Sequence, residues 1–122
     1  MHALNIKCAY EKPLKSDGFR ILIDRTWPPG ITEKEARIDL WLQDIAPSEA
    51  LLAWFNRNES RWREFQKRYA KELENKYDLL NTILAKAHKH TVSLIYSSTN
   101  RETNHAIALC VQLQFQLLKL IH

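Results

Sequence analysis

An apolar run that ends in a rigid polar turn constrains the fold of this chain more than any other feature. Residues 19–23 read Phe-Arg-Ile-Leu-Ile, which is typical of a strand buried on both faces. The turn at residues 24–30 holds a charged pair, an indole and Pro-Pro-Gly, and Thr32 and Glu35 then match the pattern that begins a helix. In open α/β sheets, ligands bind where strands end and helices follow. The sequence therefore predicts a site just after Ile23.

Two further segments are predicted to be strands, residues 3–9 by their alternation and residues 91–96 by their apolar character. The connections between strands are long and helical, which favours parallel pairing. Helices are expected just after Thr32 and near residues 48–56, 60–76, 79–88 and 103–120. We expect a helix-rich α/β fold over residues 1–122, with one small domain and a mainly parallel sheet of three or slightly more strands.

Two helical segments carry apolar faces, and we expect these faces to have different structural roles. Trp62, Phe65, Tyr69 and Leu73 recur at spacings of three and four, so they share one face, which we expect to be buried core. The segment 103–120 is apolar on several sides. A helix of this kind is either central or part of an interface, which makes it a candidate for homodimer formation.

Composition limits the partners of the protein. Its 122 residues carry 18 basic and 14 acidic side chains, a net charge of +4, which permits an anionic ligand. Basic and acidic residues are intermixed, which argues against a nucleic-acid groove. Cys8 and Cys110 lie in apolar surroundings and are expected to be reduced and buried, as in a cytoplasmic protein. The chain has neither the layout of a signal peptide nor an apolar run of membrane-spanning length, so no membrane partner is expected.

A second polar loop, residues 97–104, follows the strand predicted at residues 91–96. If the two strands that precede the polar loops are parallel neighbours, both loops project from the same edge of the sheet. The candidate site then combines proton-transfer residues with binding residues. The candidates for proton transfer are Asp24 and His105, and the candidates for binding are Arg25, Trp27, Ser97, Ser98, Arg101 and Asn104.

The second loop has the features of an anion-binding site, because it leads from a strand into the amino terminus of a helix. Free main-chain N–H groups and the helix dipole favour a phosphate or carboxylate there, and Arg25 or Arg101 could add paired hydrogen bonds. The loop has neither a Walker sequence nor an initial cysteine. The alternative is that Ser98, Thr99 or Asn100 simply caps the last helix.

Three side chains each have more than one interpretation. His105 stands in the first turn of a helix, where a neutral imidazole could act as a base or could form a structural hydrogen bond. Asp24 could be a general base, could orient Arg25, or could cap the turn. Trp27 could stack on a ligand or could fill the space between sheet and helix.

No cofactor and no metal ion are predicted. The five histidines show no pair at zinc-ligand spacing with a third ligand nearby, and no cofactor motif is present. The serines lie outside any G-x-S-x-G elbow.

Motifs along most of the chain resemble those of one known family. They are residues 20–28 with Gly30, Asp39-x-Trp41, Ala46-Pro47-Ser48, Trp54-Phe55, the aromatic and charged pattern of residues 62–73, Leu94-x-Tyr96 and Asn104-His105-Ala106. Together they resemble the YeaO-like branch of the domain-of-unknown-function family numbered 488. The resemblance implies a compact α/β domain and no particular activity. Two residues depart from the family pattern, in which an Arg is usual at Pro29 and an acidic residue is more usual at Asn100.

Three functions remain open from the sequence. The first is a small enzyme that acts on an anionic or phosphorylated metabolite at the carboxyl edge of the sheet, with Arg25 and residues 97–104 as binding groups. The second is a non-catalytic module that binds such a ligand or a nucleic acid. The third is an interaction domain whose polar residues stabilise the fold. An ordered anion in a pocket would separate the first two functions from the third.

Overall fold

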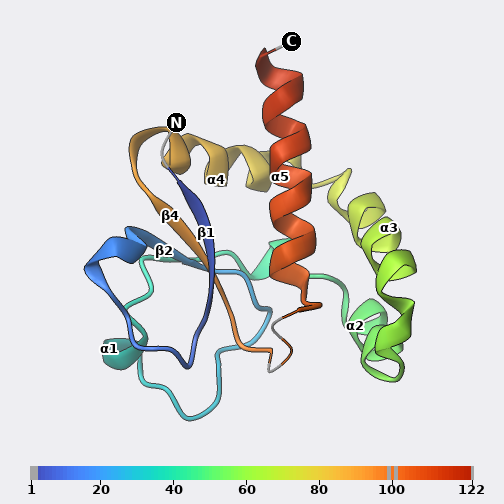
Figure 1. The fold of residues 1–122 in the computed structure, drawn as a ribbon, viewed down its shortest axis with the longest axis horizontal. Coiled ribbons are helices and arrows are strands. Elements are labelled where there is room, and N and C mark those ends of the chain that lie inside the picture. Colours follow the sequence, from blue (N-terminus) through green and yellow to red (C-terminus); the bar gives the residue numbers. More distant parts are fainter. Residues whose placement is uncertain (1–2, 99, 101, 122) are drawn as a thin grey trace.

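A four-stranded parallel sheet forms the centre of the molecule. The computed structural model describes residues 3–98, 100 and 102–121 (Figure 1). The strands are β1 (Leu4–Cys8), β2 (Phe19–Leu22), β3 (Leu40–Trp41) and β4 (Val92–Tyr96), in the spatial order β1-β4-β2-β3. All three pairings are parallel. The predicted helix-rich α/β fold is confirmed. The two residues of β3 were not predicted to be a strand, because so short a segment shows no period.

In the part of the chain that the structure describes, five α-helices connect and cover the strands. They are α1 (Glu33–Ala36), α2 (Glu49–Asn56), α3 (Trp62–Leu73), α4 (Tyr77–Lys89) and α5 (His105–Ile121), and short 3₁₀ turns lie at Lys15–Asp17 (η1), Gln43–Ile45 (η2) and Glu59–Arg61 (η3). The helix predicted from residue 60 begins later, at Trp62, because the residues before it form η3. It also ends at Leu73, three residues before the predicted end.

The capping signals in the sequence mark the starts of two helices correctly. The hydroxyl of Thr32 accepts from the Glu35 N–H while the Glu35 carboxylate accepts from the Thr32 N–H, which is the predicted capping box of α1. The hydroxyl of Ser48 accepts from the Leu51 N–H at 3.1 Å at the start of α2. Each side chain satisfies a main-chain donor that has no acceptor within its own helix.

Strands β2 and β4 are adjacent and parallel, as predicted from the helical connection between them. Phe19 is opposite Val92, and Leu22 is opposite Ile95. The chain therefore leaves both strands at the same edge, where the Ile23 N–H still donates to the Ile95 carbonyl at 3.0 Å. The two polar loops begin side by side at this point, which positions the candidate site.

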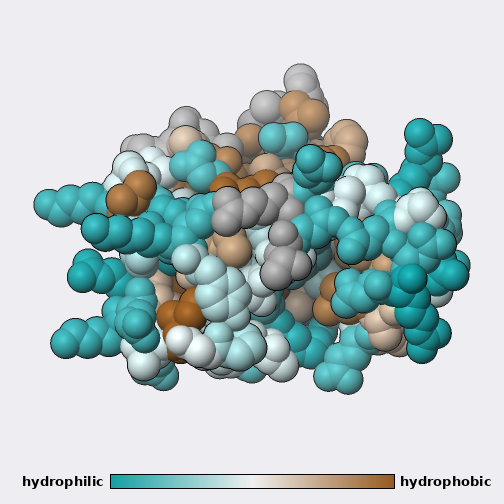
Figure 2. Space-filling view, turned by 60° about the horizontal axis from the view of Figure 1, so that its bottom comes forward, coloured by the Kyte–Doolittle hydropathy of each residue, from teal (hydrophilic) through white to brown (hydrophobic). Residues whose placement is uncertain are grey.

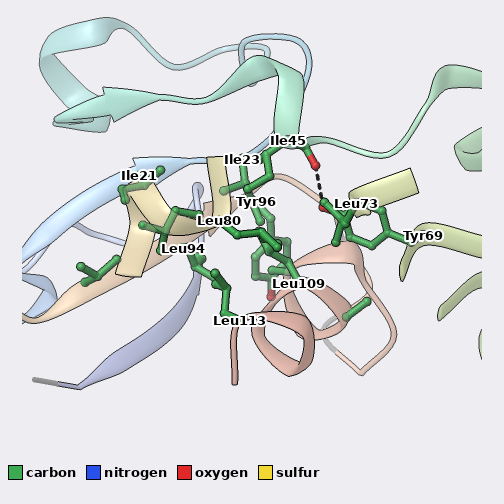
Figure 3. Packing of buried hydrophobic residues seen from close by; sticks show 14 of the residues in the cluster. Ile21, Ile23, Ile45, Tyr69, Leu73, Leu80, Leu94, Tyr96, Leu109 and Leu113 are labelled. Carbon is green, nitrogen blue, oxygen red and sulfur yellow. Dashed lines mark hydrogen bonds between the residues drawn. The ribbon is translucent and has the colours of Figure 1, made fainter. Parts of the chain in front are cut away.

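The main core lies between the sheet and helices α3, α4 and α5. Figure 3 shows Ile21 and Leu94 of the strands grouped with Leu80 of α4 and Leu109 of α5. The predicted α3 face is confirmed for three of its four residues, because Phe65, Tyr69 and Leu73 are at most 2% exposed. Trp62 is only partly buried, since it lies in the first turn of α3, at the margin of the core.

The opposite face of the sheet has an apolar region and a charged region. A small apolar cluster forms around Leu22 and Ile95, and nearer the amino ends of the strands the buried Asp17 carboxylate pairs with Arg20 at 2.6 Å and Lys7 at 2.9 Å. Burial alone would raise the pKa of Asp17, but hydrogen bonds from the Leu14 N–H, Lys7 and Arg20 outweigh it and hold the pKa below its usual value. These charges are stabilised in the interior because they are paired.

Helix α5 is central along one side and exposed along the other. Ala106, Leu109 and Leu113 are fully buried against the core, whereas Phe115 is 56% and Leu118 is 50% exposed. The expectation of a central position is confirmed for the inner side, and a homodimer through the outer side stays a prediction. Within the described residues, no helix is long and apolar enough to cross a membrane.

The two cysteines are both free thiols, as expected, but only one of them is buried. Both Cys8 and Cys110 are free thiols. Cys8 is buried as predicted, but Cys110 is only partly buried, because it lies toward the flank of α5 rather than on its inner side. Burial still raises the pKa of the Cys110 thiol.

Gly18 allows η1 and β2 to approach β4, and this approach gives a test of the fold. Gly18 has a φ of +69°, and a Cβ there would lie 2.1 Å from the Thr91 carbonyl oxygen. Gly18→Ala should therefore lower the free energy of unfolding by roughly 3 kcal/mol in urea titrations. Gly30 is the matched control, because its φ is +82° but a Cβ there would have nothing within 4 Å, and Gly30→Ala should cost only about 1 kcal/mol. Equal losses would contradict the close approach.

Candidate functional site

A cavity of about 510 Å³ opens at the carboxyl edge of the sheet, beside the ends of β2 and β4. The view in Figure 2 turns this end of the molecule forward, and hydrophilic side chains dominate the face that it shows. The wall of the cavity comes from both polar loops, from the start of α5 and from one face of α2. The lining residues are Asp24, Arg25, Thr26, Ala46, Glu49, Leu52, Phe55, Asn56, Glu59, Phe65, Ser97, Ser98, Asn100, Thr103, Asn104 and His105.

Asp24 joins the two loops at the base of this cavity. Its side chain is nine-tenths buried, and its Oδ2 atom accepts hydrogen bonds from the Ser97 N–H at 3.0 Å and from the Ser97 hydroxyl. Its main-chain carbonyl accepts from the Trp41 indole N–H at 2.7 Å. The bonds from Ser97 link β2 to β4, and the bond from Trp41 links β2 to β3. Asp24 therefore has more than the turn-capping role that is usual for an aspartate at a strand end.

His105 contacts the other oxygen of the same carboxylate. Its Nε2 atom lies 3.0 Å from Asp24 Oδ1 and 3.2 Å from the Ile23 carbonyl oxygen. Both neighbours can only accept, so Nε2 carries the proton and the neutral ring is the Nε2–H tautomer. Nδ1 is then the nitrogen that can take up a further proton. This arrangement of a carboxylate behind an imidazole is one that general bases use, and it also serves as a structural pair.

The loop before α5 is held by a chain of side-chain hydrogen bonds. Ser98 Oγ accepts from the Asn100 N–H, and Asn100 Oδ1 accepts from the N–H groups of Glu102 and Thr103. Asn104 Oδ1 accepts from the Ile107 N–H at 3.1 Å, which is the geometry of a helix cap. Asn104 is therefore the capping residue, while Ser98 and Asn100 shape the loop that precedes it.

Arg25 fastens the loop after β2 to the segment that leads into α2. Its Nη2 atom donates to the carbonyl oxygens of Ala46 at 3.2 Å and Pro47 at 3.4 Å. Lys76 donates to the same Ala46 carbonyl at 3.3 Å. Burial and then the neighbouring Arg25 charge lower the pKa of Lys76. Part of the guanidinium is thus committed to protein carbonyls rather than free to take a ligand.

The structure brings six of the eight sequence-predicted site residues to the cavity, namely Asp24, Arg25, Ser97, Ser98, Asn104 and His105. Trp27 lies elsewhere, in the apolar cluster on the opposite face of the sheet. Its ring meets Trp41 edge-on at 5.5 Å, and its N–H donates to the Ile31 carbonyl at 2.6 Å. Arg101 and Thr99 lie outside the described residues.

The part of the cavity wall that α2 and its neighbours contribute was not predicted from the sequence. Glu49, Leu52 and Asn56 recur at spacings of three and four and lie on one helical face, and Glu59 and Phe65 extend the wall. The periodicity could reveal that face, but not that it opposes the loops after β2 and β4. Within the described residues, no group of three His, Cys, Asp or Glu side chains could hold a metal ion.

The contacts of Asp24 predict a coupled effect on stability. Asp24→Asn should lower the free energy of unfolding by about 1–3 kcal/mol, because it places an amide against the Ser97 or His105 donor. Ser97→Ala should cost about 1 kcal/mol, and the double variant should lose less than the sum of the two. Urea titration of the three variants measures this coupling. The losses from Asp24→Asn and Ser60→Ala should add, because Ser60 lies on an exposed turn. Additive losses from Asp24→Asn and Ser97→Ala would contradict the hydrogen bond between Asp24 and Ser97.

Comparison with known proteins gives a family for this chain. A family model described as the inactive DUF488-N3 subclade matches residues 3–120. The uncharacterised protein YeaO of Escherichia coli is 34% identical over 108 residues, which cover 87% of this chain and 94% of the relative. The uncharacterised protein Rv3073c of Mycobacterium tuberculosis is 41% identical over 66 residues, which cover 54% of this chain and 56% of the relative. No solved structure matches the chain. The chain therefore belongs to the DUF488 family, as a YeaO-like member of its inactive DUF488-N3 subclade.

Proposed function

We propose that this protein is a cytoplasmic binding module that holds a small polar ligand in the cavity at the carboxyl edge of the sheet and leaves it chemically unchanged. The observation that carries the proposal is the cavity itself, which gathers polar side chains from both loops and from the first turn of α5. Four buried side-chain atoms lack a hydrogen-bond partner within the described residues, and three of them, Asp24 Oδ1, Arg25 Nε and Thr103 Oγ1, belong to cavity-lining residues. The His105 ring contacts Asp24 Oδ1 without the alignment of a hydrogen bond. These three atoms are shielded from the open space of the cavity, so an occupant would reach them only after a local rearrangement of the wall.

The position and size of the cavity agree with this role. Ligands of α/β proteins bind beyond the carboxyl ends of the strands, where both polar loops begin. A volume of about 510 Å³ lies within the range of small-molecule sites, roughly 300–1,000 Å³. Leu52, Phe55 and Phe65 give the cavity an apolar part beside its polar base.

Two points support binding over turnover. The subclade is described as inactive. In addition, Pro29 stands where an Arg is usual in the family pattern, and Asn100 stands where an acidic residue is more usual. Asn100 has taken a structural role, since its side chain organises the loop and contacts Glu59.

A second candidate is an enzyme that acts on an anionic or phosphorylated metabolite. The contact between Asp24 and His105 favours it, because a buried carboxylate behind an imidazole is suited to moving protons. Arg25 and the first turn of α5 would then hold the anionic group, since N–H groups at the start of a helix have no acceptor within it.

Cavity-blocking variants test the proposal. Small amines, amino acids, organic acids and inorganic phosphate are added in turn to the labelled protein, and amide shifts are recorded by NMR. We expect at least one probe to shift the amides of Ser97, Ser98 and His105. Leu52→Trp should abolish these shifts by filling the cavity, whereas Ala53→Trp, on the exposed side of α2, should preserve them.

The same spectra separate binding from catalysis. The proposal predicts that the resonances of the bound probe stay unchanged over a day, whereas conversion of the probe into a product would establish the second candidate. Shifts that survive Leu52→Trp, or the absence of shifts with every probe, would rule out a ligand site in this cavity.

A further inference from the structure

The described lining of the cavity is negatively charged. Three carboxylates, from Asp24, Glu49 and Glu59, face one guanidinium, from Arg25. Even if His105 were protonated, the three carboxylates would outnumber the two cations. The expectation of an anionic ligand rested on Arg25 and the start of α5, and the wall formed by α2 and η3 brings in carboxylates that oppose an anion.

Arg25 offers less to an anion than its charge suggests. Its Nη2 atom donates to the carbonyls of Ala46 and Pro47, and its Nε atom is buried. An anion that approached it would have to compete with those carbonyls and would also meet Asp24 in the same cavity. Paired recognition of a phosphate or carboxylate by both edges of the guanidinium is therefore restricted.

The three carboxylates differ in how many hydrogen bonds they already accept from the protein. Glu59 accepts a hydrogen bond from the Asn100 side chain, and Asp24 Oδ2 accepts from Ser97. Glu49 is exposed and, among the residues that the structure describes, carries no side-chain hydrogen bond or ion pair. The Asp24 side chain is nine-tenths buried, and its Oδ1 atom lies 3.0 Å from His105 Nε2. Glu49 is thus the carboxylate most available to a ligand.

The apolar part of the wall suits an organic cation. Leu52 lies one helical turn after Glu49, and the rings of Phe55 and Phe65 stack at 4.6 Å with 30° between their planes. Because the two rings are almost fully buried and stacked on each other, they and Leu52 provide an apolar surface for the body of a ligand rather than a face for its charge. The carboxylate and the apolar surface therefore belong to the same wall.

We infer that the ligand of this cavity is an organic cation, a protonated amine on an apolar body, with Glu49 as the principal partner of its ammonium group. The inference rests on the proposed function, since it names the class of ligand for the same cavity. It concerns recognition and involves no chemical step.

Three matched probes test the inference, because they share a phenylethyl body and differ in charge. They are phenethylamine, 2-phenylethanol and 3-phenylpropionate, each titrated into the labelled protein with the amide shifts of Ser97 and Ser98 as the readout. The dissociation constant should be lowest for the amine and highest for the carboxylate, with about a fivefold step between neighbours at low salt. The steps should shrink as salt screens the charges.

Substitution of the carboxylates identifies the partner of the amine. Glu49→Gln should weaken phenethylamine about fivefold and leave 2-phenylethanol unchanged, because glutamine keeps the size and removes the charge. Glu59→Gln should weaken the amine less, because Glu59 is already bonded to Asn100. Glu74→Gln, an exposed residue outside the cavity, is the control for net charge and should have no effect.

The outcomes separate this inference from the proposed function. If 3-phenylpropionate binds most tightly, or if Glu49→Gln leaves phenethylamine binding unchanged, the inference is overturned while a ligand site remains. If none of the three probes shifts the cavity amides, the inference is overturned, while the proposed function is decided by the wider set of amines, amino acids, organic acids and phosphate. The predicted order of affinities, with its dependence on Glu49, supports both.

Discussion

The carboxylate of Asp24 is the interaction on which the site depends. It stands just past the end of β2, accepts two hydrogen bonds from Ser97 after β4, and contacts His105 at the start of α5. The main-chain carbonyl of Asp24 also accepts from Trp41 of β3. One buried residue therefore connects three strands and a helix at the edge where the cavity opens. A buried charge persists only when such partners surround it, so each of these elements fixes the position of the others.

This constraint gives the cavity a buried base and a more exposed wall. The base, formed by Asp24, Ser97 and His105, is largely buried and hydrogen-bonded. The wall opposite comes from α2, whose position depends on Arg25 and on Tyr69, which donates to the Ile45 carbonyl at 2.7 Å (Figure 3). Under the proposed function, ligand specificity would lie in the exposed part of the wall, at Glu49 and Glu59.

Much of this arrangement could be predicted from sequence because each step used local information. Apolar strands, capping residues and polar loops are local patterns, and parallel pairing of β2 with β4 then brings Asp24, Ser97 and His105 together. The approach of α2 to the loops could not be predicted, since it depends on tertiary bonds such as those from Arg25 to the Ala46 and Pro47 carbonyls. Trp27 had two interpretations from sequence, and its contact with Trp41 required β3, whose two residues carry no period.

Hydrogen exchange at the Ser97 amide tests most directly whether Asp24 holds the two loops together. The Ser97 N–H lies beyond the last residue of β4 and donates to Asp24. In the native protein this amide should exchange at least about a hundredfold more slowly than in an unstructured chain, and Asp24→Asn should accelerate it at least about tenfold. The Leu94 amide, in the middle of β4, should accelerate only by the factor that corresponds to the lower free energy of unfolding, and it should stay more protected than Ser97 in both proteins. Unprotected Ser97 in the native protein, or equal exchange at Ser97 in the two proteins, would contradict this role of Asp24.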